Sequence, residues 1–145
     1  MIKIKQITTQ ETITVRHPVL REGKPIDSCY FDGDDSASTF HLGAFYENQL
    51  TGVITVLSNN LNTINLTNHY QIRGMAVLKE FQKKGIGEAL VKHAENEIKK
   101  INGNIIWMNA RIAAIGFYEK LGYIIKGKEF DIPEIGLHYT MIKYL

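Results

Sequence analysis

The stretch YQIRGMAVLKEFQKKGIGEALVKHAENEI, residues 70–98, decides the fold class of this chain. Its first third predicts a strand from about Tyr70 to Leu78. Its last half predicts a helix that packs on a sheet, because apolar residues recur at four-residue spacing: Ile86, Leu90, Ala94 and Ile98. A turn with two glycines, Gln82–Gly87, separates the two elements. The helix also presents opposite charges four residues apart, at Glu88 and Lys92 and at Glu95 and Lys99.

The start of the chain predicts a strand followed by a helix. IKIKQI (2–7) alternates apolar and polar residues, which is typical of a strand. Thr8 and Thr9 can cap a helix that runs to about Leu20, and Glu11 falls in its first turn.

Residues 21–36 are polar and rich in turn formers, so we expect a loop that lies over the surface. Two strands follow, STFHLGAFYE (38–47) and LTGVITVL (50–57), with Asn48-Gln49 as the expected hairpin turn. The asparagine-rich residues 58–69 predict a long exposed loop.

Beyond the central helix the sequence predicts a short buried strand, NIIWMN (104–109), and a helix from about Ala110 to Leu121. Two strands close the chain, at 123–130 and 136–145. The order β-α-β-β-β-α-β-α-β-β mixes hairpins with crossovers, which indicates a mixed α/β sheet and not a regular doubly wound one. No linker or repeat divides residues 1–145, so we expect a single domain.

Composition excludes several classes of protein. Seventeen basic and fifteen acidic side chains give a formal net charge of +2, which is too near neutral for a nucleic-acid-binding surface. Cys29 is the only cysteine, which argues against a disulfide framework and a cysteine-rich zinc site. No apolar stretch has the length of a membrane span, and MIKIKQITTQ lacks the apolar core of a signal peptide. We therefore expect a cytoplasmic protein that contacts neither nucleic acid nor membrane.

The turn Gln82–Gly87 has the chemistry of an anion site. The first N–H groups of a helix have no acceptor within the helix, and the helix dipole adds partial positive charge there. Glycines let the backbone approach a ligand closely, and Lys83 and Lys84 add charge, so a pyrophosphate would suit this turn. The dinucleotide fingerprint is excluded because Leu90 replaces its third glycine, and the P-loop pattern is absent.

Two segments in the expected order carry a family resemblance. Met75-Ala76-Val77 with Gln82-x-x-Gly85-x-Gly87 resembles motif A of the GNAT family of acyl-CoA-dependent N-acetyltransferases. NARIAAIGFYEKLGY (109–123) closely resembles the family's motif B. More loosely, four other segments look like the family's ElaA-like branch: VRHPVLREGKP (15–25), Cys29, FDGDD (31–35) and EIGLHYTM (134–141). The resemblance implies a mostly antiparallel central sheet with helices on both faces.

The resemblance also implies a role for each matching residue, with acetyl-CoA as cosubstrate. The strand edge at Met75, Ala76 and Val77 would pair with the pantetheine arm, and one N–H there would bind the thioester carbonyl. The pyrophosphate would be held by backbone N–H groups of Gln82, Lys83, Lys84, Gly85, Ile86 and Gly87. Gln82 stands where many members have arginine, so one side-chain charge is missing. Asn109 would bind the pantetheine, and Tyr118 would protonate the departing thiolate.

The side chains themselves support Tyr118 and leave the general base open. Attack of an amine on a thioester expels a thiolate, which a phenol can protonate or hydrogen-bond. The amine must lose a proton, and His41, His69, His138 or water could accept it. Arg16 and the acidic cluster of Asp32, Asp34 and Asp35 lie where this family shapes its acceptor site. The cluster could attract a cationic amine, but we favour its interpretation as a hydrated turn. Cys29 is interpreted as structural and Trp107 as core.

The sequence thus predicts an N-acetyltransferase that transfers an acetyl group from acetyl-CoA to a primary amine by direct attack in a ternary complex. The acceptor, a small molecule or a peptide amine, stays unidentified, and no metal is implied. A homodimer through the last strand is compatible with the family. The alternatives are a non-catalytic acyl-CoA-binding module on the same fold and a nucleotide-phosphate-binding protein outside the family.

Overall fold

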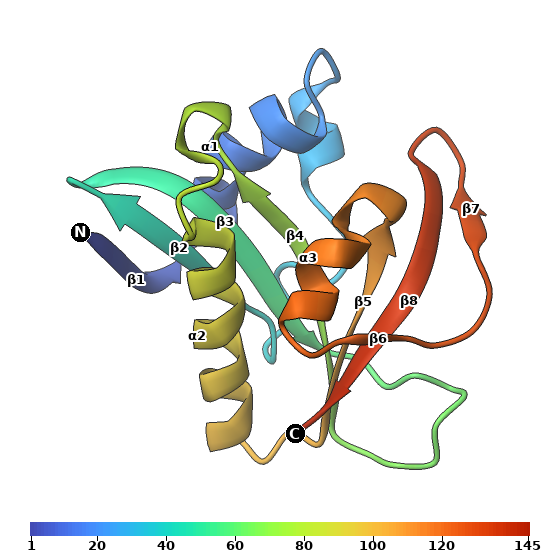
Figure 1. Cartoon of the computed structure of the whole chain (residues 1–145). Coiled ribbons are helices and arrows are strands. Elements are labelled where there is room, and N and C mark those ends of the chain that lie inside the picture. The colour runs from blue at the N-terminus through green and yellow to red at the C-terminus, as the bar shows by residue number, and fades with distance from the viewer.

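The computed structural model describes residues 1–145, whose strands form one eight-stranded sheet (Figure 1). The strands are β1 (Ile2–Ile7), β2 (Phe40–Tyr46), β3 (Gln49–Ser58), β4 (His69–Val77), β5 (Ile105–Arg111), β6 (Ile124–Ile125), β7 (Phe130–Ile132) and β8 (Gly136–Tyr144). The α-helices are α1 (Thr9–Leu20), α2 (Ile86–Lys100) and α3 (Ile115–Lys120), and the 3-10 helices are η1 (Ile26–Cys29), η2 (Lys79–Phe81) and η3 (Ile112–Ala114).

The sheet runs in the order β1-β2-β3-β4-β5-β8-β6, with β7 paired to β8. All neighbours are antiparallel except β4 and β5, which confirms the predicted mixed and mostly antiparallel sheet. The parallel pair is short, because only His69–Gln71 of β4 pairs with Ile105–Trp107 of β5. Beyond these residues the two strands diverge and leave the sheet open (Figure 1).

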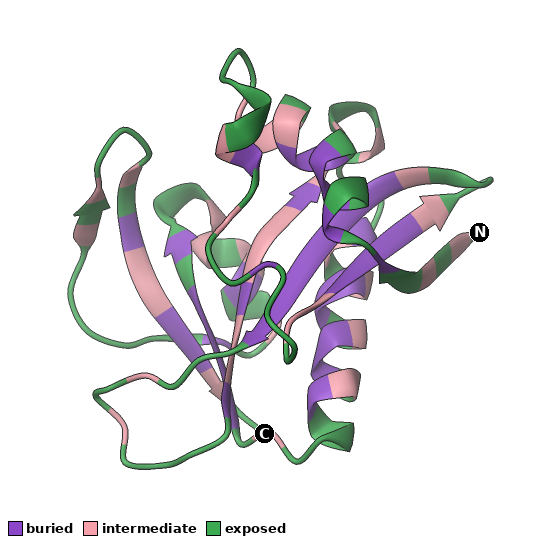
Figure 2. Ribbon diagram, turned by 180° about the vertical axis from the view of Figure 1, so that it is seen from behind, coloured by how far each residue is buried: buried purple, intermediate pink, exposed green.

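Helices cover both faces of the sheet. The predicted stripe of α2 (Ile86, Leu90, Ala94 and Ile98) is buried against β2, β3 and β4, which confirms the sequence pattern. Val15 of α1 packs with Ile7, Val53 and Ala76 in a separate apolar cluster on the opposite face. Figure 2 shows buried residues along the central strands and on α2. No helix is both long and apolar enough to cross a membrane.

The start of α1 follows the sequence prediction. Thr8 accepts a hydrogen bond from the Glu11 N–H, and the Glu11 carboxylate accepts one from the Thr8 N–H, at 3.2 and 2.9 Å. This capping box satisfies two N–H groups that have no partner within the helix. Trp107 is also buried as predicted, and its indole N–H donates to the Asn59 carbonyl.

Four local predictions were wrong. The hairpin turn is Glu47-Asn48, one residue earlier than expected; both residues have positive φ (47° and 68°), as a type I′ turn requires. Ala110 does not begin a helix, because β5 continues to Arg111 in register with β8; η3 follows, and α3 then runs over Ile115–Lys120. The expected strand at 123–130 is two short strands, β6 and β7.

The fourth wrong prediction concerns a charge pair on α2. Glu88 and Lys92 form their predicted pair at 3.5 Å, whereas Glu95 does not pair with Lys99. The Glu95 carboxylate instead accepts hydrogen bonds from Lys143 of β8 and from the Tyr123 hydroxyl. A tertiary partner on the sheet therefore replaces the neighbour on the helix.

Candidate active site

A cavity of about 360 Å³ opens where β4 and β5 diverge. Met108, Ala110 and Tyr118 line it and belong to the apolar core on the α2 side of the sheet. Phe31 and Arg73 also line it, on the α1 side of the sheet. The Phe31 ring contacts the Arg16 guanidinium of α1, and Arg73 forms an ion pair with Asp34, the partner of Arg16. The cavity therefore passes through the opening in the sheet and joins its two faces.

Tyr118 lies at the α2 side of this cavity. The residue is 7% exposed, and its ring makes edge contacts with Phe117 and Tyr123 at centroid distances of 5.0 and 5.8 Å. Burial raises the pKa of Tyr118 to about 12, so the phenol is protonated at neutral pH and can donate a hydrogen bond.

The edge of β4 that faces the opening has unpaired backbone groups. The Leu78 N–H donates to the Thr51 carbonyl of β3 at 2.8 Å, and alternate residues of a strand direct their peptide groups to the same edge. Ala76 therefore directs its backbone toward β3, whereas Met75 and Val77 direct theirs toward the opening. The Val77 carbonyl is already bound, because the Gln82 side chain donates to it at 2.9 Å.

The glycine turn leads directly into α2. Lys83 and Gly85 have positive φ (62° and 83°), and no side chain caps the helix that begins at Ile86. The first N–H groups of α2 are therefore free to bind an anion. Gly87 serves packing, because a Cβ there would lie 3.3 Å from the Phe117 ring.

Asn109 lies on β5 opposite Thr140 of β8 and lines the cavity. Its Oδ1 accepts a hydrogen bond from the Thr140 hydroxyl at 2.9 Å. This contact orients the side-chain amide and leaves its two N–H bonds available as donors.

Of the three candidate histidines, only His138 lines the cavity. Its Nδ1 lies 2.8 Å from the Gly136 carbonyl, which can only accept, so Nδ1 carries the proton and a neutral ring leaves Nε2 free. His69 is buried, and its Nδ1 accepts from the Leu61 N–H.

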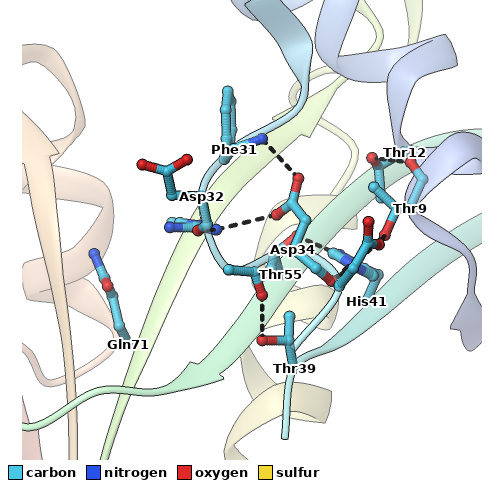
Figure 3. A network of polar contacts seen from close by, with 12 residues as sticks. Thr9, Thr12, Phe31, Asp32, Asp34, Thr39, His41, Thr55 and Gln71 are labelled. Atoms are coloured by element: carbon cyan, nitrogen blue, oxygen red, sulfur yellow. Dashed lines mark hydrogen bonds and ion pairs between the residues drawn. The ribbon is translucent and has the colours of Figure 1, made fainter. Parts of the chain in front are cut away.

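His41 is buried inside a polar network. Its Nε2 donates to the Asp34 carbonyl at 3.0 Å, and its Nδ1 accepts from the Thr55 hydroxyl at 2.7 Å (Figure 3). Burial lowers the pKa of His41 below its usual 6.5, although the Asp34 carbonyl and carboxylate oppose this. Both ring nitrogens are engaged, so His41 supports the structure around the cavity.

Asp34 is the centre of that network, and its interpretation as part of a hydrated turn was wrong. The buried carboxylate accepts hydrogen bonds from Arg16, Arg73 and the Phe31 N–H, at distances of 2.7 to 3.2 Å (Figure 3). Burial alone would raise the pKa of Asp34, but the bonds from Arg16 and Phe31 and the charge of Arg16 lower it. Asp32 and Asp35 are exposed, in line with the prediction. Cys29 is buried, as its structural interpretation requires.

Sequence reasoning missed the arginines of the cavity. Arg21, Arg73 and Arg111 line it together with the Phe31 ring, over which the Arg21 and Arg73 guanidinium groups lie at 5.1 and 5.7 Å. The available signal was their placement, since Arg73 lies within a predicted strand and Arg111 lies two residues after the predicted strand 104–109. No three His, Cys, Asp or Glu side chains are grouped as a metal ion would require.

A sheet opened between two parallel strands, with a glycine turn before the following helix, is the architecture of acyl-CoA-dependent acetyltransferases. The sequence model of the acetyltransferase (GNAT) family matches residues 5–123, and the chain belongs to this family. It is 34% identical over 145 residues to YitI, an uncharacterized N-acetyltransferase of Bacillus subtilis (strain 168), and covers 97% of that protein. All of the present chain takes part in this match.

Solved structures share the fold. Escherichia coli ElaA matches with a TM-score of 0.75 at 15% identity, over 99% of both chains. An aminoglycoside 6′-N-acetyltransferase complexed with coenzyme A matches with a TM-score of 0.78 at 16% identity, over 98% of this chain and 96% of the other. At these identities the likeness establishes the fold, and the acceptor must be sought in this chain's own residues.

Proposed function

We propose that this chain, as one domain, is an N-acetyltransferase that transfers an acetyl group from acetyl-CoA to a primary amine. The observation that carries the proposal is the cavity through the sheet, with the unpaired edge of β4 on one wall and the Tyr118 phenol on another. An acyl-thioester reaching the cavity from the α2 side and an amine reaching it from the α1 side would meet at the opening. Direct attack in a ternary complex needs this arrangement.

Cosubstrate binding would use backbone groups at two places. The pantetheine arm would lie along the open edge of β4, where Met75 offers a free N–H to the thioester carbonyl, whose oxygen gains negative charge during attack. The N–H groups of Gln82 to Gly87 would hold the pyrophosphate beside Lys83 and Lys84. The Gln82 side chain holds the Val77 carbonyl, and its backbone N–H donates to the Lys79 carbonyl at 3.3 Å, so Gln82 would have to release that bond to reach the pyrophosphate. The Asn109 amide would donate to the pantetheine.

Two side chains would handle protons. The raised pKa of Tyr118, about 12 against about 8.5 for a typical thiol, favours a hydrogen bond to the departing sulfur over complete proton transfer. His138 is the best-placed base, because its free Nε2 and its position in the cavity allow it to take a proton from the amine directly or through water.

Release of free thiol from acetyl-CoA in the presence of a panel of primary amines tests the proposal. We expect amine-dependent thiol release and an acetylated product whose mass increases by one acetyl group. Binding of acetyl-CoA without transfer to any amine of a broad panel would favour the non-catalytic acyl-CoA-binding module. Preferential binding of ATP or NAD would contradict the cosubstrate assignment.

A further inference from the structure

We propose that the acceptor amine carries an anionic group, a carboxylate or a phosphate, which arginines on the α1 side of the cavity bind. The proposal rests on the function proposed above and defines the substrate class of the same site. It starts from the distribution of one residue type. The chain contains only four arginines, and its other basic side chains are lysines. Three of the four line the cavity: Arg21, Arg73 and Arg111.

Arginine is the residue suited to this task. Its planar guanidinium presents paired donors that match a carboxylate or phosphate, whereas lysine offers a compact point charge. The fourth arginine, Arg16, is fully buried behind the cavity, where it binds Asp34 and lies 4.2 Å from the Phe31 ring centre. All four guanidinium groups therefore lie in one region of the molecule, although they come from different elements. Arg16 belongs to α1, Arg21 follows the last residue of α1, and Arg73 and Arg111 belong to β4 and β5.

Arg21 and Arg111 have no ion-pair partner in the protein. No aspartate or glutamate lines the cavity, and Glu134, which lines an adjoining pocket together with Arg21 and Arg111, forms no ion pair with either. The nearest buried carboxylate, Asp34, already receives two guanidinium groups, from Arg16 and Arg73. Asp35 accepts the Thr9 hydroxyl, and Asp32 is exposed and outside the lining, with its carbonyl bound by Arg73. An anionic ligand would supply the missing negative charge.

Donors remain free to bind such a ligand. Arg111 forms no hydrogen bond or ion pair with the protein, and Arg21 makes a single bond, to its own neighbour Leu20. Arg73 uses only Nη2, so its Nη1 stays available. The glycine turn that would hold the pyrophosphate is not part of the cavity lining, so these arginines are separate from the proposed cosubstrate phosphate site.

The remaining lining residues indicate that the body of the acceptor is apolar. Leu20, Phe31, Ile132 and Ile135 add apolar surface around the arginines. A small amine with an apolar body and one anionic group would match both features.

Binding of anions that cannot react tests the site independently of transfer. The protein saturated with CoA would be titrated with 3-phenylpropanoate, phenyl phosphate and the neutral 3-phenylpropanamide, in wild type, Arg111→Gln and Lys3→Gln. The last variant removes one exposed charge on β1 and is the matched control. We expect wild type and Lys3→Gln to bind at least one anion 10-fold or more tightly than the amide. We expect Arg111→Gln to lose this preference. The better anion distinguishes a carboxylate from a phosphate site.

A second experiment measures steady-state acetylation of phenylalanine and of phenylalaninamide at saturating acetyl-CoA. We expect a higher kcat/KM for phenylalanine in wild type, and loss of this preference in Arg111→Gln with an unchanged Kd for acetyl-CoA. Equal binding of the anions and the amide would overturn the proposal, as would an arginine variant that weakens acetyl-CoA to the same degree. Anion binding without transfer to any amine would instead contradict the proposed function.

Discussion

The phenol of Tyr118 is the most direct test at the scale of single residues. Tyr118→Phe keeps the ring contacts with Phe117 and Tyr123 and removes only the hydroxyl. We expect kcat to fall about 100-fold, because the departing sulfur loses its hydrogen-bond donor, while the KM for acetyl-CoA stays within about twofold. Steady-state kinetics on a reactive amine measures both values. A kcat close to wild type would remove Tyr118 from the reaction and leave it a core residue.

The lowered pKa of His41 makes the free energy of unfolding depend on pH. Its folded-state pKa lies below 6.5, so an unfolded chain binds the proton first as pH falls, and the neutral buried ring loses its stabilising effect below pH 6.5. We expect the free energy of unfolding to decrease between pH 7.5 and 5.5 and His41→Gln to flatten this decrease. Urea denaturation at the two pH values measures it, with His93→Gln on α2 as control. An unchanged slope in His41→Gln would contradict the assignment.

The same residues show where sequence reasoning stops. FDGDD has the composition of a hydrated turn, and nothing local distinguishes Asp34 from its exposed neighbours. Its burial depends on Arg16 and Arg73, which lie 18 and 39 residues away. Tyr118, by contrast, was singled out from the sequence because its segment resembles a family motif over fifteen residues; the structure places it in the cavity, and its role in the reaction stays a prediction.

At the scale of secondary-structure elements, the glycine turn is tested by two substitutions at one position. A Cβ at Gly85 meets no atom within 4 Å, but any side chain there must adopt φ of 83° at a cost of about 1 kcal/mol. Gly85→Ala and Gly85→Glu share this cost, and only the second adds negative charge beside the proposed pyrophosphate. We expect calorimetry to give a Kd for CoA at least 10-fold weaker in Gly85→Glu than in Gly85→Ala. Equal affinities would place the phosphates elsewhere.

The capping box of α1 gives a second prediction at this scale. Thr8→Ala removes the side-chain acceptor of the Glu11 N–H and should lower the free energy of unfolding by about 1 kcal/mol. Thr14→Ala is the matched control, because Thr14 is exposed within the same helix and bonds only the Glu11 carbonyl. We expect that variant to be neutral or slightly stabilised. Chemical denaturation measures both, and equal losses would contradict the role of the cap.

Hydrophobic periodicity predicted the elements well where one face is buried, as on α2. It failed where pairing with a distant strand determines where an element begins or ends. Residues 110–121 have helical composition, yet Ala110 and Arg111 continue β5 because Tyr139 and His138 pair with them. The proposed strand at 123–130 was divided for a related reason, since β6 and β7 each pair with a different part of β8.

At the scale of the whole molecule, function depends on a feature that no local pattern reveals. The opening exists because β4 and β5 pair over only three residues at one end. The arginines of the cavity are separated by up to 90 positions in the sequence and come together only when the sheet forms. The order of the elements could be predicted from the sequence, whereas the point of divergence and the charge around it required the structure.

Calorimetric titration of acetyl-CoA into the purified protein, with CoA, ATP and NAD as comparators, tests the central claim most directly. The open edge of β4 and the free N–H groups of α2 predict selective micromolar binding of acetyl-CoA and CoA. A folded protein that binds neither, or that binds ATP or NAD more tightly, would contradict the account.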